Sequence, residues 1–160
     1  MPNTIKDFIS EEFGCQPIII NSALVSAQER KRYYWTNIPG IQQPVDKEIY
    51  FKDILEYKNN DIHNKLIPVQ YDRKNGIGKE LTKSITLCAS DWRGLNRNQK
   101  QNAVLNLEDM SIRRLTPLEC ERLQTVPEGY TEGVSNTQKY KMLGNGWTID
   151  IIAHILSYIK

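Results

Sequence analysis

PIIINSALVSAQERKRYYWTNIPG, residues 17–40, contains two β-prone segments separated by a polar stretch. Its opening isoleucines predict a strand over residues 17–25, and its later aromatic run predicts a second strand over residues 32–38. Pro39 and Gly40 are typical of a turn and end the second strand. The stretch therefore predicts two adjacent strands.

The segment before these strands predicts a helix. Residues 4–13 place apolar side chains at positions 5, 8, 9 and 13, which is a helical stripe, and Gly14 stands where a helix usually ends. A helix followed by two adjacent strands is typical of the closing edge of an α/β sheet. Because an independent α/β domain would need more strands before it, we expect the chain to begin inside a larger fold.

Polar side chains alternate where the second strand begins. Gln28, Arg30 and Arg32 occupy every second position, and alternate side chains of an extended chain share one face. Two guanidinium groups and an amide on one face would suit a phosphate or a base edge. The alternative is an ordinary solvated surface at the start of a strand.

The composition is that of a soluble globular protein with no global bias toward nucleic acid. The chain has 160 residues, 25% charged and 39% hydrophobic, with a net charge of +2. The charge is uneven, however, since residues 91–100, DWRGLNRNQK, hold three cations and one anion. Arg113 and Arg114 add a second basic pair.

The three cysteines indicate neither a metal site nor a disulfide framework. Cys15, Cys88 and Cys120 lie far apart, without a CxxC pair or a cluster with His63 or His154. The apolar runs are too short to cross a membrane, and no signal peptide is visible. The expectation is a reduced, cytoplasmic protein that binds no metal.

The middle of the chain, residues 41–111, is predicted to be a small irregular lobe. Strands are expected at residues 65–69 and 84–89 only. Gly76 and Gly78 form an isolated GxG without a helical pattern after it, so they are interpreted as a turn and not as a phosphate loop.

Regular structure is predicted again from residue 115. Thr116 can cap a helix, Pro117 suits its first position and Glu119 completes a capping box, so a helix is expected from residue 116 to 124. Cys120 is interpreted as a packing residue of this helix.

The tail, residues 148–159, is predicted to be a second helix. It carries isoleucine or leucine at positions 149, 151, 152, 155, 156 and 159, so most of its surface is expected to be buried. A chain of this length offers little to bury it against, which again indicates a missing partner.

Together these segments resemble the C-terminal half of DNA (cytosine-5) methyltransferases of phage or bacterial type. Residues 28–32, QERKR, are similar to the family motif Q-x-R-x-R. Residues 115–124, LTPLECERLQ, are similar to its L-T-x-x-E-x-x-R-L-Q motif, and residues 140–147, YKMLGNGW, to its closing Y-K-x-x-G-N-S/A-V motif.

The resemblance implies an α/β fold, the C-terminal part of a class I methyltransferase dependent on S-adenosylmethionine. Residues 1–40 would form the closing helix-strand-strand edge of the catalytic domain, residues 41–111 the target-recognition region, and residues 112–160 the helices returning to the catalytic domain. Double-stranded DNA is the implied substrate.

The family's Pro-Cys nucleophile and Glu-Asn-Val acid have no counterpart in the sequence. The resemblance therefore implies that this half is inactive alone and needs an N-terminal catalytic half, whether as a separate polypeptide or as the rest of a truncated enzyme. The alternative is a non-catalytic DNA-binding remnant or regulator derived from such an enzyme.

By the same resemblance, Arg32 would reach the exocyclic oxygen of a flipped cytosine, Arg30 would steady the catalytic loop and a nearby phosphate, and Gln28 would hold both arginines. Gly144, Asn145 and Gly146 would line the cofactor pocket, with Gly144 permitting a tight turn. Glu119 is interpreted as a helix cap, with Arg122 as its packing or ion-pair partner.

Some residues depart from the family pattern. Gly146 replaces the common Ser or Ala, Trp147 replaces Val, and Thr125 stands where the family more often has Gly. Within the recognition region, a dense set of donors could read base edges and touch phosphates, although a polar surface loop is the alternative. This set comprises Arg93, Asn96, Arg97, Asn98, Gln99 and Lys100.

Overall fold

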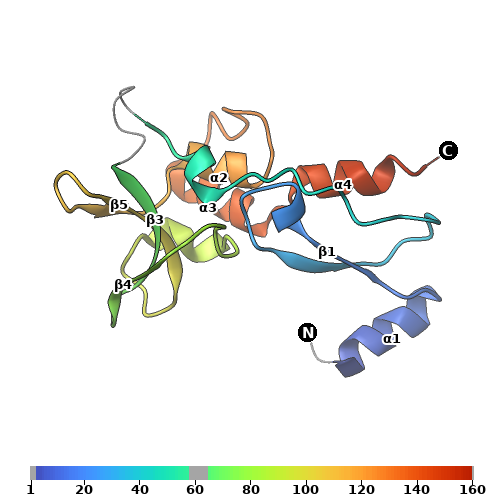
Figure 1. The fold of residues 1–160 in the computed structure, drawn as a ribbon. Coiled ribbons are helices and arrows are strands. Elements are labelled where there is room, and N and C mark those ends of the chain that lie inside the picture. The colour runs from blue at the N-terminus through green and yellow to red at the C-terminus, as the bar shows by residue number, and fades with distance from the viewer. Residues whose placement is uncertain (1–2, 58–64, 160) are drawn as a thin grey trace.

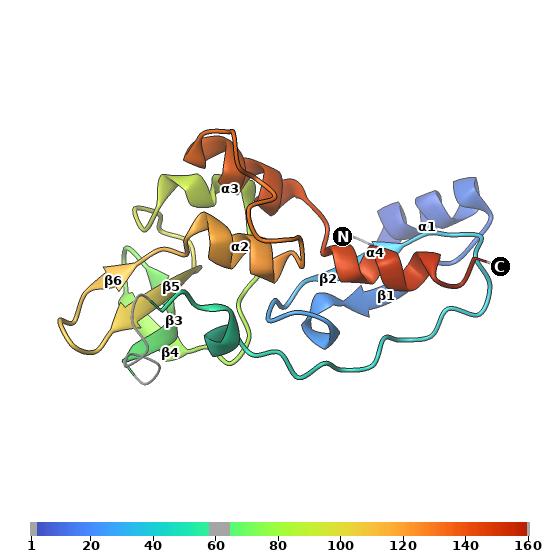
Figure 2. The ribbon, with the colours of Figure 1, turned by 90° about the horizontal axis from the view of Figure 1, so that it is seen from above.

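The computed structural model describes residues 3–57 and 65–159 and has two parts (Figures 1 and 2). One part, here called the edge unit, contains helix α1 (Asn3–Phe13), strands β1 (Ile18–Asn21) and β2 (Lys31–Tyr34), and helix α4 (Ile149–Leu156). The other part, here called the lobe, contains a separate sheet covered by helices. Helix α1 and both predicted strands are therefore present, but β1 ends at Asn21, where a 3-10 turn replaces the rest of the strand predicted to residue 25, and β2 ends at Tyr34 and not at residue 38.

The strands of the edge unit form an antiparallel hairpin. Ile18 pairs with Tyr34 and Ile20 with Arg32, and a short 3-10 helix, η1 (Ser22–Leu24), lies between them. The side chain of Asn21 accepts hydrogen bonds from the backbone of Ala23 and Arg30 (3.2 and 3.0 Å), which closes the connection. In the described part of the chain this sheet has two strands, fewer than an independent sheet needs.

The lobe is more regular than the sequence predicts, because it contains a four-stranded antiparallel sheet in the order β4-β3-β5-β6. The strands are β3 (Leu66–Asp72), β4 (Gly76–Glu80), β5 (Gln101–Asn106) and β6 (Ile112–Arg113). The strand predicted at residues 65–69 corresponds to β3. Gly76 and Gly78, interpreted as a turn, lie in the edge strand β4 instead.

The strand predicted at residues 84–89 is absent. Ser84 makes an isolated bridge with Gln28, and the 3-10 helix η3 (Ala89–Arg93) begins where the strand should end. The apolar pattern arises because Leu87 is buried in the core, although its backbone hydrogen bonds go to side chains and not to a neighbouring strand.

Helix α2 (Pro117–Leu123) begins at the predicted capping box of Thr116 and Glu119. Glu119 is buried and pairs with both terminal nitrogens of Arg113 (2.8 and 2.7 Å). The expected partner, Arg122, instead contacts Glu128 (2.7 Å). Glu119 and Arg122 are three residues apart on a helix and could meet. They do not, because the Glu119 carboxylate points back toward the start of α2, where it accepts a hydrogen bond from the backbone of Thr116.

A further helix, α3 (Asn136–Asn145), was not expected from the sequence. Helix α4 follows it directly, and its predicted burial is only partial. Ile151 and Ile155 are buried against Ile20 of the hairpin, whereas Ile149 and Leu156 are 45% and 51% exposed. The exposed residues lie on the opposite side of α4 from the hairpin.

The two parts differ in the cores they hold. Twelve buried residues form the main core of the lobe, where α2 and α3 meet the loops around η3 and η2 (Phe51–Ile54). The edge unit has a cluster of four, which are Ile20, Val25, Ile151 and Ile155.

Candidate functional site

Gln28 lies where the hairpin, α2 and the loop before η3 meet. Its side chain is fully buried and accepts a hydrogen bond from the backbone of Leu87 (2.9 Å). It also donates to the carbonyl of Leu123 (3.3 Å) and to the side chain of Gln124 (3.4 Å). Every polar atom of the amide is thereby engaged inside the protein, so Gln28 positions neighbouring segments.

Arg30 joins three segments through its guanidinium group. Nη1 donates to the carbonyl of Leu87 (3.0 Å), and Nη2 donates to the carbonyls of Gly144 (3.2 Å) and Gly146 (3.0 Å). Arg30 is only 5% exposed. Burial lowers the pKa of Arg30, and the nearby Arg32 guanidinium lowers it further. Arg30 therefore connects the hairpin, the lobe and the end of α3.

Arg32 is the exposed member of the predicted set. Its Nη1 donates to the carbonyl of Lys31 (2.9 Å). The three side chains do not form one exposed fork, because β2 begins only at Lys31 and the chain before it turns into the interior. Arg32 thus has donors available for an external acceptor, close to the residue that holds the end of α3.

The glycine before Asn145 is required by a close approach and not by a turn. Gly144 lies within α3, and a Cβ there would stand 2.3 Å from the backbone of Cys88 and Ala89. Glycine therefore lets α3 pack directly on the start of η3. Gly144 is buried beneath this contact and offers no surface to a ligand.

The exposed part of the predicted cofactor motif is Asn145, the last residue of α3. Gly146 follows it with its carbonyl held by Arg30, and Trp147 is 62% exposed. The exposed amide of Asn145 and the exposed indole of Trp147 leave this turn open to a ligand, whereas both backbone polar groups of Gly146 are already bonded, the N–H to Met142 (2.8 Å) and the carbonyl to Arg30.

The predicted DNA-contacting set divides into one internal and several exposed side chains. Arg97 donates to Ser90 (2.6 Å) and to Gln101 (3.3 Å) and forms an ion pair with Asp91. Because its guanidinium is consumed inside the lobe, Arg97 holds the loop in place. The exposed members are Arg93, Asn96, Asn98, Gln99 and Lys100.

Two cationic groups lie near the half-buried ring of Trp92. Nothing in the sequence predicted this arrangement. Arg93 lies 5.4 Å and Lys141 of α3 lies 5.8 Å from the ring centroid. Lys141 was missed because it is distant in sequence from the basic stretch at residues 91–100. The packing of α3 on η3 brings the two together.

Residues 3–57 and 65–159 hold no group of three or more His, Cys, Asp and Glu side chains arranged for a metal. Burial raises the pKa of the Cys120 thiol well above its usual range, which agrees with the packing role predicted for it. No described helix combines the length and apolar character needed to cross a membrane.

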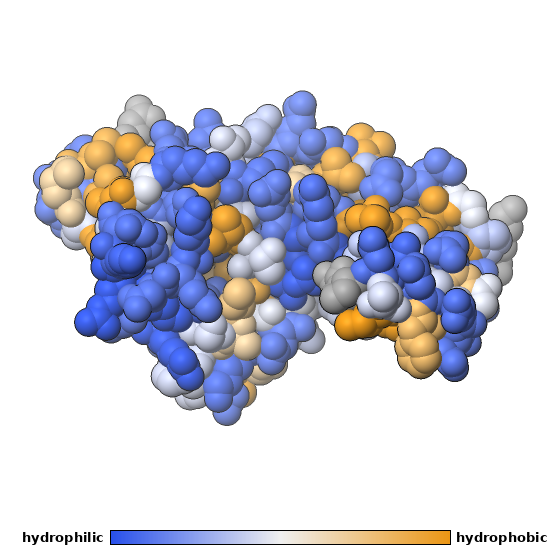
Figure 3. Space-filling model, turned by 90° about the horizontal axis from the view of Figure 1, so that it is seen from below, coloured by the Kyte–Doolittle hydropathy of each residue, from blue (hydrophilic) through white to orange (hydrophobic). Residues whose placement is uncertain are grey.

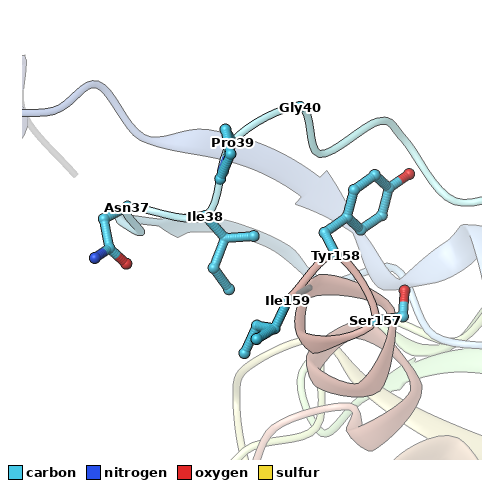
Figure 4. Close-up of a pocket in the computed structure, with 7 residues that line it drawn as sticks. All are labelled: Asn37, Ile38, Pro39, Gly40, Ser157, Tyr158 and Ile159. Atoms are coloured by element: carbon cyan, nitrogen blue, oxygen red, sulfur yellow. The ribbon is translucent and has the colours of Figure 1, made fainter.

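A groove lies at the far end of the edge unit, between the segment after β2 and the end of the α4 segment. Ile38 and Pro39 line one side, and Tyr158 and Ile159 line the other (Figure 4). The groove is mostly apolar, and none of the predicted site residues lines it.

Comparison with known proteins identifies the family. The sequence model of C-5 cytosine-specific DNA methylases matches residues 45–160. The orphan methyltransferase M.SPRI of Bacillus phage SPR is 37% identical over 135 residues, covering 56% of this chain and 31% of that protein. The DNA (cytosine-5)-methyltransferase DRM2 of Oryza sativa subsp. japonica is 26% identical over 174 residues, covering 98% of this chain and 28% of that protein.

Solved structures share the fold. The Entamoeba histolytica methyltransferase EhMeth superposes with a TM-score of 0.60 at 19% identity, covering 89% of this chain and 52% of that one. The Dnmt2 methyltransferase of S. pombe superposes with a TM-score of 0.56 at 14% identity, covering 88% and 55%. At these identities the likeness concerns the fold alone.

The chain spans about a third or less of the length of these curated relatives. The family match nevertheless covers well over half of the chain. The protein belongs to the family of C-5 cytosine-specific DNA methylases.

Proposed function

We propose that this chain is the DNA-recognition and cofactor-pocket-completing half of a methyltransferase acting on C5 of cytosine in duplex DNA. The nucleophilic cysteine and the acidic residue would come from an N-terminal half. The observation that carries the proposal is the junction at Arg30, since one buried side chain links the lobe, the hairpin and the turn at Asn145.

The turn after α3 fits the methyl donor of this family, S-adenosylmethionine. Asn145 would donate and accept hydrogen bonds through its exposed amide, and Gly146, which Met142 and Arg30 hold in place, would line the pocket beside it. Gly144 would act from beneath by fixing the position of the turn. When bound, S-adenosylmethionine supplies the electrophilic methyl group.

Arg32 is the residue of this chain that we expect to act on the base. Enzymes of this kind take the target base out of the duplex before reacting with it, and a thiolate from the other half would add to the ring. The exposed guanidinium of Arg32 would donate to the exocyclic oxygen of the base and stabilise the charge that develops there. Arg30 would keep the position of Arg32 fixed relative to the turn at Asn145.

The edge unit would bind the other half. Its hairpin leaves strand edges without a partner among the described residues, and such edges favour pairing with another strand. Large apolar side chains are also exposed on three of its elements, including Phe8 and Phe13 of α1 (62% and 70%), Ile19 of β1 (51%) and Leu156 of α4 (51%). Apolar surface accordingly shows on this end of the molecule (Figure 3).

The test uses labelled S-adenosylmethionine and duplex DNA of mixed sequence. The purified chain alone should transfer no methyl group, whereas the chain co-purified with an N-terminal half that carries the Pro-Cys and Glu-Asn-Val motifs should label the DNA. In that complex, Arg32→Met should remove activity while Asn145→Ala weakens cofactor binding without preventing assembly.

Clear methyl transfer by the chain alone would refute the proposal that the nucleophile and the acid come from an N-terminal half. DNA binding without any association with a catalytic half would instead favour a non-catalytic remnant of such an enzyme.

A further inference from the structure

We infer that the β3–β4 turn, through Arg73 and Lys74, is a second DNA-contacting element of the lobe, and that with Lys100 it binds the phosphodiester backbone. This inference rests on the proposed DNA-recognition function and adds residues that the basic stretch at residues 91–100 does not include.

The fold places this turn beside the predicted recognition loop. The backbone nitrogen of Arg73 donates to the carbonyl of Arg97 (2.9 Å), and Tyr71 of β3 pairs with Gln101 of β5. The turn at residues 73–75 and the loop at residues 94–100 therefore leave the sheet at the same end and are directly bonded to each other.

The turn is held in one shape by Asp72. Its carboxylate accepts hydrogen bonds from the backbone of Lys74 (3.0 Å) and Asn75 (2.7 Å) and from the side chain of Asn75 (3.0 Å). The side-chain hydrogen bond from Asn75 lowers the pKa of Asp72, so the carboxylate stays charged and continues to order the turn. A preordered turn loses little conformational freedom when it binds a ligand.

The charges that remain available here are positive. Arg97 is neutralised by Asp91 inside the lobe, whereas Arg73, Lys74 and Lys100 are exposed. With Asp72 counted against them, this end of the sheet carries a net charge of +2, from three cations and one anion. A local excess of exposed cations is the electrostatic footprint of phosphate binding.

The uncharged donors of the loop lie between these cations in the chain. Asn96, Asn98 and Gln99 can read base edges by hydrogen bonding, while cations on either side hold the backbone and fix the register. Figure 3 shows a continuous hydrophilic surface over the end of the lobe where the turn and the loop emerge. The arrangement favours duplex DNA over a small anion, because the cations are spread over two loops.

The experiment measures binding of the full chain to a fluorescein-labelled duplex by anisotropy, over about 50 to 200 mM salt. The variant is Arg73→Gln/Lys74→Gln, and the charge-matched control is Lys6→Gln/Lys52→Gln, which removes two positive charges that lie outside the turn and outside the loop at residues 94–100. Each phosphate contact contributes about 0.9 to the slope of log affinity against log salt. The variant should therefore lose up to about 1.8 from that slope, with weaker binding to matched and scrambled duplexes alike.

Unfolding curves of the variant should match those of the wild type, because both side chains are exposed. A slope equal to that of the control variant would overturn this inference and leave the proposed function standing. Absence of any salt-dependent DNA binding by the wild-type chain would overturn both. A loss confined to one duplex sequence would overturn the phosphate assignment, because it would show base contacts instead.

Discussion

The lobe and the edge unit are joined in one chain but are stabilised very differently. The main core of the lobe has twelve buried residues, among them Phe51 and Leu123 at 0% exposure. The edge unit buries four and exposes apolar side chains on α1, β1 and α4. The lobe is thus organised as a self-contained structure, whereas the edge unit resembles one side of a larger sheet.

Polar contacts make up for the small core of the edge unit. Ser26 donates to the carbonyl of Leu123 (2.6 Å). The hydroxyls of Thr148 and Ser22 are hydrogen-bonded to each other (2.8 Å), and the Thr148 hydroxyl also lies 3.2 Å from the side-chain oxygen of Gln124. The side chains of Ser22, Ser26, Gln124 and Thr148 are all buried, and their hydrogen bonds join the hairpin, the end of α2 and the start of α4. The hairpin is therefore held mainly through its attachment to α2 and α4, and this attachment can be tested.

The largest expected effect contrasts one leucine in each part. Leu123→Ala should destabilise the chain by about 2–5 kcal/mol, because it leaves a cavity in the main core. Leu156→Ala should change the unfolding free energy by less than about 0.5 kcal/mol, since this side chain is half exposed. Urea unfolding of both variants makes the measurement.

Equal losses of stability in both variants would show that the lobe and the edge unit are stabilised alike. If Leu156→Ala is neutral in the chain alone but weakens co-purification with the catalytic half, the exposed face of α4 contributes to binding that half.

A second contrast concerns the two arginines of the hairpin. Arg30→Met should cost about 2–3 kcal/mol, because it leaves three backbone carbonyls without their charged donor. Arg32→Met should be nearly neutral in stability, because Arg32 is exposed. Thermal unfolding measures the loss of stability expected for Arg30→Met. Methyl transfer by the assembled enzyme measures the loss of activity expected for Arg32→Met. Equal stability of the two variants would show that the junction does not depend on Arg30.

These two residues also show how far the sequence could predict the site. The alternation of Gln28, Arg30 and Arg32 drew attention to the segment, but alternation cannot tell which side chains turn inward. That depends on Leu87 and Gly146, which are distant in the sequence and meet Arg30 only in the folded chain. Likewise, packing brings Lys141 to the ring of Trp92 and Arg73 to Arg97, which leaves no local signal in the sequence.

The fold shows the same division. Strongly patterned elements were predicted at the right places, including α1, the hairpin strands and α2, although both strands end earlier than predicted. Helix α3 was missed because its sequence, NTQKYKMLGN, has few apolar residues and ends in a pair that is typical of turns. Strand β4 was missed because GIGKE carries two glycines, and pairing with β3 outweighs their poor strand propensity.

The third prediction tests the contact between α3 and η3. Gly144→Ala should cost about 1–3 kcal/mol, because the new Cβ would overlap backbone atoms that cannot move aside independently. Gly146→Ala is the matched control, since its nearest neighbour is the carbonyl of Met142 at 3.1 Å and its φ is −68°. Differential scanning calorimetry compares the two. Similar melting temperatures would indicate that α3 is only loosely attached to the start of η3 within the lobe.

The smallest expected effect concerns Thr125, which connects α2 to α4. Thr125 has a φ of 54°, which is unfavourable for a β-branched residue. Its hydroxyl accepts a hydrogen bond from the backbone of Asp150 (2.9 Å) and donates to the carbonyl of Gln124 (2.8 Å). Since the N-cap residue Thr148 makes no side-chain cap, Thr125 caps α4 from a distance.

Two substitutions separate the strain from the cap. Thr125→Ala should destabilise by about 1 kcal/mol, because it removes the cap and keeps a side chain at positive φ. Thr125→Gly also removes the cap but adopts this φ without strain, so its unfolding free energy should lie above that of the Ala variant and close to the wild type. The reverse order in urea titrations would mean that the backbone at residue 125 is not strained. In that case the hydroxyl alone would account for the stability of the connection between the lobe and α4.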